Sequence, residues 1–302
     1  MSINYNSWSL KKYFILLSIL VLFEGIALSQ TKIQVITKTI AKNIPFTVGK
    51  TIKIVGEKAA INIQSWDKDY VSANISLIAK HPNKKTAEED IRFIDYKVAE
   101  SAELIEISNF FSQKSGYKEI TSNLTAKFEI KVPSSCSLSI VDVYGSVSLI
   151  NINGKINIDL NFAQLNMINI GGDLSIKTYY GDIDAESINS TLKLKSEMAE
   201  ITFRDLLGTC LFETNYGNLS ISPNEKLTSL KIDASRTSVQ IVVNNFEAYC
   251  FKIETQNGDI TVPKILKKQV VKSLFKEQFY QNNDKPLIQV NGKYSSITLK
   301  NN

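Results

Sequence analysis

YGSVSL (144–149), FAQLNM (162–167), YGDIDA (180–185), MAEITF (198–203) and YGNLSI (216–221) return along the chain at a constant step of 18 residues. Each unit begins with a large residue, continues with Gly or Ala and a polar residue, and closes with an apolar–polar–apolar triplet. A second series of apolar pairs runs nine residues out of phase with the first: Leu138/Ile140, Ile156/Ile158, Leu174/Ile176, Leu192/Leu194 and Cys210/Phe212. Alternation of apolar and polar residues is typical of β-strands, and a fixed period of this size indicates stacked structural repeats.

The repeat predicts an all-β fold, a right-handed β-solenoid with two short strands and about 18 residues per coil. Every strand would pair with its equivalents in the coils above and below. After small insertions, residues 230–241 are expected to form one coil and residues 251–262 the next, and an interruption at 264–286 precedes a last coil at 288–299. A β-sandwich is the alternative, but it does not require columns of one residue type at a strict step.

The part of the chain before the repeats carries the same alternation around a different insertion. The pairs at 52–54 and 61–63 already show the step of nine residues, which extends the coil pattern back to Ile52. A capping box, Thr86-x-x-Glu89, predicts a short helix that starts near Ala87. The expected organisation is a signal peptide at 1–29, a β-rich part with a helix and hairpin insert at 30–133, and a β-solenoid region at 134–302 with an amphipathic insert at 264–286.

The N-terminus predicts export. Lys11 and Lys12 precede the apolar run 13–23, and small residues follow before Gln30, as in a secretory signal that is removed. An uncleaved membrane anchor is the alternative, although it would need about 20 apolar residues and Glu24 interrupts the run. The mature chain is therefore expected in the periplasm, at the cell surface or secreted.

Composition and residue types argue against several functional classes. The net charge of +5 is spread along the chain, so no nucleic-acid partner is expected. His81 is the only histidine, which leaves no His-based metal cluster and no nucleophile–histidine pair. The three cysteines, at wide spacing, do not form a disulfide framework. We assign no catalytic, cofactor-binding or metal-ligating residue, expect no cofactor, and do not expect an enzyme.

Two columns of the repeat are candidate sites. The polar column after the small residue consists of Ser146, Gln164, Asp182, Glu200, Asn218, Ser238 and Asp259. Asp182 and Glu200 would stack in adjacent coils, close enough to bind a cation or to share a proton, although a solvated turn column is the favoured interpretation. The aromatic column Tyr144, Phe162, Tyr180 and Tyr216 would be a sugar-stacking strip if it faced water. We expect instead an internal stack that stabilises a corner.

The interruption has a composition of its own. Residues 263–280 contain five lysines and one glutamate among large apolar residues. Leu266, Val270 and Leu274 would lie in line on a helix, which predicts a basic amphipathic helix. We expect such a helix to cover a flank or an open end of the solenoid; peripheral contact of 264–280 with an anionic membrane is the alternative.

Several stretches carry a family resemblance. IQSWDKDYV (63–71), KVPSSCSLSI (131–140) and the turns of the YGDI type resemble the domain-of-unknown-function 4097 family of proposed adhesins, which is related to the head domain of proposed autotransporter adhesins. The resemblance covers roughly residues 52–299. It implies an exported or envelope-associated β-solenoid without accepted catalytic residues, and the insert at 264–286 departs from the family pattern.

Three hypotheses for function follow. The first is a non-enzymatic, exported, adhesin-like or envelope scaffold module that binds an envelope glycan or a surface protein along one rigid face. The alternative is a polysaccharide-binding or polysaccharide-degrading β-helix protein, which exposed aromatic residues and clustered carboxylates in one groove would favour. A polymerising scaffold similar to bactofilins is disfavoured by the export signal. The sequence leaves the oligomeric state open.

Overall fold

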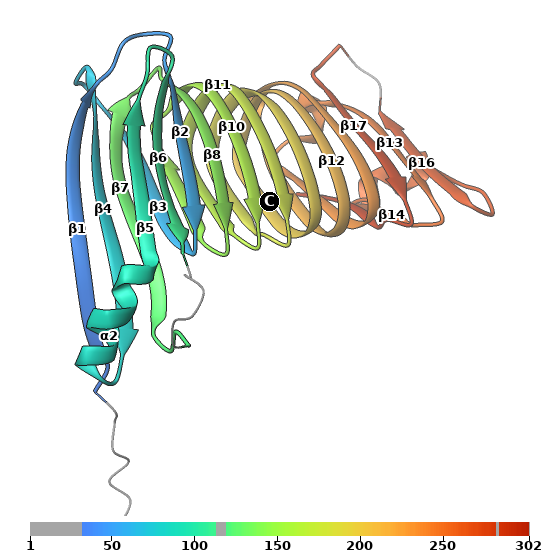
Figure 1. The fold of residues 1–302 in the computed structure, drawn as a ribbon. Coiled ribbons are helices and arrows are strands. Elements are labelled where there is room, and N and C mark those ends of the chain that lie inside the picture. Colours follow the sequence, from blue (N-terminus) through green and yellow to red (C-terminus); the bar gives the residue numbers. More distant parts are fainter. Residues whose placement is uncertain (1–31, 113–118, 282–283, 302) are drawn as a thin grey trace, which may run out of the picture.

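The computed structural model of the chain describes residues 32–112, 119–281 and 284–301 (Figure 1). The signal peptide expected at 1–29 lies outside these residues. All described strands belong to one sheet of 18 strands that winds into a stack of coils. No helix in this part of the chain is long and apolar enough to cross a membrane.

Parallel strands form the middle of the stack, and their register repeats the sequence period. They are β8 (Ser137–Val143), β9 (Ser146–Ile150), β10 (Asn153–Asn161), β11 (Gln164–Tyr179) and β12 (Ile183–Val243). Leu165 lies opposite Ile183, and Ile156 lies opposite Leu174, so these paired residues are 18 positions apart. β12 continues through several coils without a break, as Figure 1 shows.

Alternating side chains of these strands point inward and fill the interior of the stack. The buried columns contain Val147, Leu165, Ile183, Ile201 and Leu219 in one series and Ile156, Leu174, Leu192 and Cys210 in the other. Burying one aliphatic side chain of this size contributes about 1.5–3 kcal/mol. Because each column continues from coil to coil, a single repeat depends on its neighbours for stability.

At the N-terminal end, the order of the coils in space differs from their order in the chain. β2 (Thr51–Glu57) and β3 (Ala59–Trp66) form the first coil, which pairs in parallel with β8 and β9. The other edges of this coil pair, also in parallel, with β6 (Leu104–Phe111) and β7 (Asn123–Pro133). The first coil is therefore inserted between two later segments of the chain.

The C-terminal end has the same arrangement in reverse. β17 (Leu287–Lys293) and β18 (Ile297–Asn301) pair on one side with the last coil of β12. On the other side they pair with β13 (Cys250–Gln256) and β14 (Ile260–Thr261), which follow β12 through the short turn η3 (Phe246–Ala248). The expectation that 251–262 forms the coil next to 230–241 is therefore wrong. A terminal segment with partners on both edges satisfies its backbone N–H and C=O groups on both sides.

Antiparallel strands close the N-terminal end of the stack. β1 (Gln34–Pro45) pairs with β4 (Tyr70–His81), β4 pairs with β7, and β5 (Ile94–Glu100) pairs with β6. The helix α2 (Lys84–Asp90), which the turn η2 (Ile91–Phe93) follows, lies beside β1 and β4. The predicted start near Ala87 is wrong, because Asn83 is the N-cap: its side chain accepts the backbone N–H of Thr86 at 3.2 Å.

A hairpin, and not the expected amphipathic helix, covers the C-terminal end. The turn η4 (Lys264–Gln269) leads into β15 (Val270–Lys272), which pairs antiparallel with β16 (Lys276–Gln281). β16 in turn pairs antiparallel with β13 and buries Phe279 completely. Without this segment, one edge of β13 would have unpaired backbone N–H and C=O groups, and pairing with β16 satisfies them. This favours a hairpin over the helix that the spacing of the apolar residues predicts. Leu266 is also buried against the core, so the segment does cover the open end.

Candidate functional site

Each coil turns one corner at a residue in the left-handed backbone region. In successive coils these residues are Lys58, Tyr144, Phe162, Tyr180, Met198, Tyr216, Arg236, Tyr294 and Asn257, with φ between 49° and 60°. The large residue is thus left-handed in every one of these coils, whereas among the glycines that follow it only Gly217, with φ of 105°, has a positive φ. The need for glycine at the next position is one of space, because a Cβ on Gly181 would lie 2.1 Å from the carbonyl oxygen of Ala163.

The side chains at this corner form one continuous row along the stack, which we call the corner ladder. The rings of Tyr144 and Phe162 are stacked with centroids 5.3 Å apart, and those of Phe162 and Tyr180 with centroids 4.8 Å apart. The backbone N–H of each of these residues donates to the coil beyond, for example from Tyr180 to the carbonyl oxygen of Glu197 at 3.0 Å. The row is therefore held in register by the same bonds that hold the coils together.

A cation lies over an aromatic ring near each end of the corner ladder. The Lys58 Nζ lies 5.4 Å from the ring centroid of Phe111, the last residue of β6. The guanidinium carbon of Arg236 lies 5.5 Å from the centroid of Tyr216 and 5.2 Å from that of Tyr294. Each such contact at an exposed site contributes about 0.5–1 kcal/mol. The corner ladder thus extends from Phe111 to Asn257 in the order of the coils.

The corner ladder is exposed, so the expectation of an internal aromatic stack is wrong. The exposed fractions of Tyr144, Phe162 and Tyr180 are 59%, 46% and 48%. A non-glycine residue in the left-handed region costs about 1–2 kcal/mol, and an aromatic pair contributes about 0.5–1.5 kcal/mol beyond the area it buries. Stacking between coils therefore offsets much of the backbone strain at these corners.

The geometry limits what the corner ladder can recognise. The planes of Tyr144 and Phe162 are inclined by 13° and those of Phe162 and Tyr180 by 6°, so neighbouring rings cover each other's faces. Arg236 covers one face of Tyr216 and one of Tyr294. The row therefore presents ring edges, hydroxyl groups and two cations to a partner. It does not present a series of free faces for stacking of sugar rings.

An open hollow of about 600 Å³ lies beside the corner ladder on the strands that lead into it. Its lining residues come from four successive coils: Lys177, Thr178, Tyr179, Lys195, Ser196, Glu197, Glu213, Thr214, Asn215 and Asp233. Lys195 Nζ and Glu213 Oε2 form an ion pair of 2.7 Å across it. The hollow places positive, negative and hydroxyl side chains at the edge of the corner ladder.

The opposite corner of the coils is polar and satisfies its own hydrogen bonds. Asn151, Asn169, Ser187 and Asp205 also have left-handed backbones. The Asn169 amide donates to Asn151 Oδ1 at 2.8 Å, and the Ser187 hydroxyl donates to Asp205 Oδ2 at 3.0 Å. We call this row, with Asn224, the polar corner. It contrasts with the corner ladder on the same coils.

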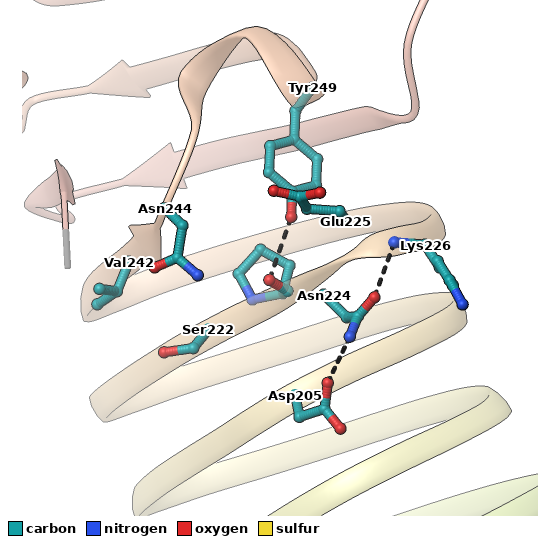
Figure 2. A pocket seen from close by; sticks show the side chains of 9 residues that line it. Asp205, Ser222, Asn224, Glu225, Lys226, Val242, Asn244 and Tyr249 are labelled. Carbon is teal, nitrogen blue, oxygen red and sulfur yellow. Dashed lines mark hydrogen bonds between the residues drawn. The ribbon is translucent and has the colours of Figure 1, made fainter.

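Figure 2 shows a pocket of about 430 Å³ at the end of the polar corner. The Asn224 amide donates to Asp205 Oδ1 at 2.6 Å, and the Tyr249 hydroxyl donates to the carbonyl oxygen of Pro223 at 3.1 Å. Burial, together with the nearby Glu225, raises the pKa of Tyr249 to about 12. These groups bind one another, so the pocket has the character of a structural junction.

The predicted carboxylate column is a solvated turn column. Asp182 Oδ1 accepts the backbone N–H of Glu200 at 3.2 Å, and both carboxylate oxygens of Glu200 accept from the Asn218 amide at 2.7 and 2.9 Å. Asp184 forms an ion pair with Arg204. The described residues contain no group of three or more His, Cys, Asp or Glu that could hold a metal ion. Burial raises the pKa of the Cys136 and Cys210 thiols to about 12, which makes both poor nucleophiles.

One carboxyl group lies buried behind the corner ladder. Asp142 is fully buried, and its oxygens accept no hydrogen bond from the described residues. It lies between Gly56 and Gly145, where an added Cβ would fall 2.4 and 2.2 Å from its oxygens. Burial raises its pKa to about 7, and the nearby Val143 amide opposes part of this rise. The buried carboxyl group of Asp142 therefore destabilises the fold at neutral pH, where it begins to ionise.

Sequence reasoning missed five members of the corner ladder: Phe111, Lys58, Arg236, Asn257 and Tyr294. A signal for them exists. Each follows the second apolar residue of a strand pair by four positions, as Tyr144 follows Ile140 and Tyr294 follows Val290. The aromatic column was predicted only from residues that are aromatic and 18 positions apart, so lysine, arginine and asparagine at the same corner, and rings outside the strict step, were not included.

Comparisons with solved structures find matches at low sequence identity. A proposed adhesin from Parabacteroides merdae is 9% identical, with 87% of this chain and 96% of that chain covered and a TM-score of 0.39. A proposed lipid-binding protein from Parabacteroides distasonis is 14% identical, with the same coverage and a TM-score of 0.39. A proposed adhesin from Bacteroides fragilis is 12% identical over 88% and 97% of the two chains, with a TM-score of 0.31.

The family comparison is more informative. No curated protein matches the chain. The family model described as Toastrack DUF4097 matches residues 50–293, which is most of the chain and nearly all of the described sheet. The match confirms the predicted family and its all-β, solenoid-like fold. The chain therefore belongs to the Toastrack DUF4097 family.

Proposed function

We propose that this chain is a non-enzymatic, adhesin-like module that binds an envelope glycan or a surface protein along the corner ladder. The observation that carries the proposal is the row of exposed rings and cations along the coils, from Lys58 to Tyr294. Aromatic and arginine side chains supply much of the binding energy at protein interfaces. A rigid row of such groups would bind by many weak contacts made at once.

A polysaccharide-binding role is the second candidate, and the hollow beside the corner ladder favours it. Tyr179 lines this hollow together with hydroxyl, amide and charged groups. Carbohydrate sites commonly combine an aromatic side chain with such hydrogen-bonding groups. A polysaccharide-degrading role has less support, because Asp182 and Glu200 are engaged in turn hydrogen bonds.

The proposal also covers the location of the chain and the details of its fold. They are export to the periplasm, cell surface or medium, a right-handed winding with about 18 residues per coil, and a division into parts at 30–133 and 134–302. No nucleic-acid partner is included, since the net charge is only +5. Contact of 264–280 with a membrane is also included, and the oligomeric state is left open.

The test compares two corners of the same coils. The chain from Lys32 onward would be applied to arrays of bacterial polysaccharides and immobilised surface proteins, with two double variants beside it. Tyr180→Ser/Tyr216→Ser alters the corner ladder, and Asn169→Ser/Asp205→Ser alters the polar corner. We expect the first variant to lose about tenfold or more in affinity, as for two interface residues that each contribute more than 1 kcal/mol, and the second to bind as the parent does. Equal binding by both variants, or hydrolysis of a polysaccharide by the parent, would overturn the proposal.

A further inference from the structure

The outer face of the C-terminal hairpin is unusually apolar for the end of a rod. Ile265, Val271, Leu274 and Phe275 are 79%, 62%, 87% and 66% exposed. They lie on η4, on β15 and in the turn between β15 and β16, at the end of the molecule opposite to α2 (Figure 1). The inner face of the same hairpin is used for packing, since Leu266 and Phe279 are buried. The exposed side chains are therefore not needed to cover the core.

The N-terminal cap shows what an ordinary end looks like. Repeat proteins need terminal units whose outer face is polar. The exposed positions of β1 are mostly polar or charged, including Thr37, Lys38, Lys42 and Asn43, with Val35 as the exposed large apolar residue of that strand. Both caps close the same core, so the apolar outer face of the hairpin calls for a partner.

Charge identifies the partner. Residues 263–280 contain five lysines against Glu277 as the acidic residue. Two of these lysines are already paired: Lys272 Nζ lies 2.6 Å from Glu277, which also accepts the backbone N–H of Ile260, and Lys276 Nζ lies 3.0 Å from Glu254. Lys264 and Lys267 are exposed on η4 beside Ile265. The face thus combines protruding apolar side chains with the positive charge of Lys264 and Lys267 beside them.

We propose that this hairpin docks on an anionic lipid surface, with Val271, Leu274 and Phe275 inserted among the headgroups and the lysines over the phosphates. Amphipathic segments bind membranes through buried apolar area plus attraction to anionic lipids. The turn is well formed for this role, because the Ser273 backbone N–H donates to the carbonyl oxygen of Lys276 at 2.8 Å. The inference rests on the membrane contact of 264–280 that the proposed function includes, and deepens it by naming an anionic lipid surface and the side chains that insert. It uses the end of the rod and not its side.

The hairpin lies next to the end of the corner ladder. The backbone N–H of Asn257, the last member of the corner ladder, donates to the carbonyl oxygen of Phe275 at 2.9 Å. The apolar turn therefore stands at the end of the corner ladder. A chain docked through this turn would hold the corner ladder pointing away from the lipid surface, with its edges free for a partner.

The test is co-sedimentation with vesicles of phosphatidylcholine alone and of phosphatidylcholine with phosphatidylglycerol. The described strands all lie between Gln34 and Asn301, so the chain from Lys32 onward carries the whole described sheet without the apolar run at 13–23. We expect this chain to bind the anionic vesicles, and Leu274→Ser/Phe275→Ser to weaken binding by about tenfold or more. Val48→Ser, at an exposed apolar residue between β1 and β2, is the matched control and should bind as the parent does.

Two further readouts make the result decisive. Phe275→Trp should shift its fluorescence to shorter wavelength when anionic vesicles are added, which reports insertion even if the double serine variant folds poorly. The corner-ladder variant Tyr180→Ser/Tyr216→Ser should bind vesicles normally, so failure here and failure of the proposed adhesion are distinguishable. The inference is overturned if the parent ignores anionic vesicles, if the double serine variant binds equally, or if that variant instead converts a dimer of the parent into a monomer.

Discussion

The rings of Phe162 and Tyr180 lie parallel within 6°, with centroids 4.8 Å apart, although the residues are 18 positions apart and both are about half exposed. The centroid distance equals the spacing of neighbouring strands in a sheet, about 4.8 Å. The pair is thus a direct consequence of coil stacking. It places an apolar row on the surface of the rod, where one would otherwise expect polar turn residues.

The left-handed backbone of Tyr180, with φ of 56°, predicts a specific pattern of tolerance. Tyr180→Val puts a β-branched side chain into this region and should lower the free energy of unfolding by about 2–3 kcal/mol, from strain plus the lost stacking. Tyr180→Asn should cost about 1 kcal/mol, since Asn tolerates the conformation. Urea denaturation of both variants measures the difference. Equal losses would show that backbone strain at the corner is unimportant.

Gly181 and Ala199 occupy the same column, but exchange should destabilise the chain more at Gly181 than at Ala199. Gly181→Ala places a Cβ 2.1 Å from the carbonyl oxygen of Ala163, so neighbouring coils must move apart. We expect a loss of about 1–3 kcal/mol, as for other overpacked sites. Ala199→Gly, the control, should cost no more than about 1 kcal/mol. Thermal unfolding of the two variants tests this, and a neutral Gly181→Ala would contradict the close approach of the coils.

Asp142 predicts an unusual dependence of stability on pH. Its pKa is about 7 in the folded chain and 3.8 in the reference state, so between these values the folded chain holds the proton and the unfolded chain does not. The stability contributed by this residue therefore falls as the pH rises from about 4 to about 7, by about 2–4 kcal/mol. Urea denaturation at a series of pH values measures it.

The control for this dependence is Asp142→Asn, which keeps the shape of the side chain and removes the titration. Carboxylates such as Glu106, whose pKa Lys97 lowers, act in the opposite sense but contribute equally to both proteins. The difference in free energy of unfolding between the parent and the variant should shift in favour of the variant as the pH rises. A difference that stays constant from pH 4 to pH 8 would show that the Asp142 carboxylate is solvated.

Ser295 should fix the last coil between its two neighbours. It is buried; its Oγ accepts the backbone N–H of Thr237 at 3.2 Å, and its carbonyl oxygen accepts the Thr255 hydroxyl at 2.9 Å. Ser295→Ala leaves the Thr237 N–H without this acceptor and should cost about 1–2 kcal/mol. Hydrogen exchange of 287–301 should become faster. Ser296→Ala, at the neighbouring position, is the control, and equal exchange in both variants would argue against the inserted position of this coil.

The interior of the stack was predictable from the sequence, and its ends were not. Inward residues such as Leu165 and Ile183 reveal themselves by period and alternation, and so does the coil that begins at Ile52. The same pattern recurs at 230–241, 251–262 and 288–299, so any two of these segments would be compatible neighbours. Which of them pair is decided by connections and by the caps.

The exposed position of the corner ladder could not be derived from alternation. A left-handed residue such as Tyr144 interrupts the two-residue period, so its distance from the inward residue Val147 does not tell which way it points. The prediction of a helix in the insert at 264–286 was wrong for a similar reason. Leu266 and Val270 have helical spacing, but a free edge at β13 offers backbone hydrogen bonds that no pattern within the segment reveals.

The exposure of the corner ladder is the basis of the proposed function, and hydroxyl-radical footprinting tests it most directly. The chain supplies matched pairs: Met198 and Tyr144 in the corner ladder, and Met167 and Tyr249 with about 1% of their surface exposed. We expect Met198 to be oxidised much faster than Met167, and Tyr144 much faster than Tyr249. Equal protection of Met198 and Met167, and of the two tyrosines, would contradict an exposed corner ladder and the adhesin-like function built on it.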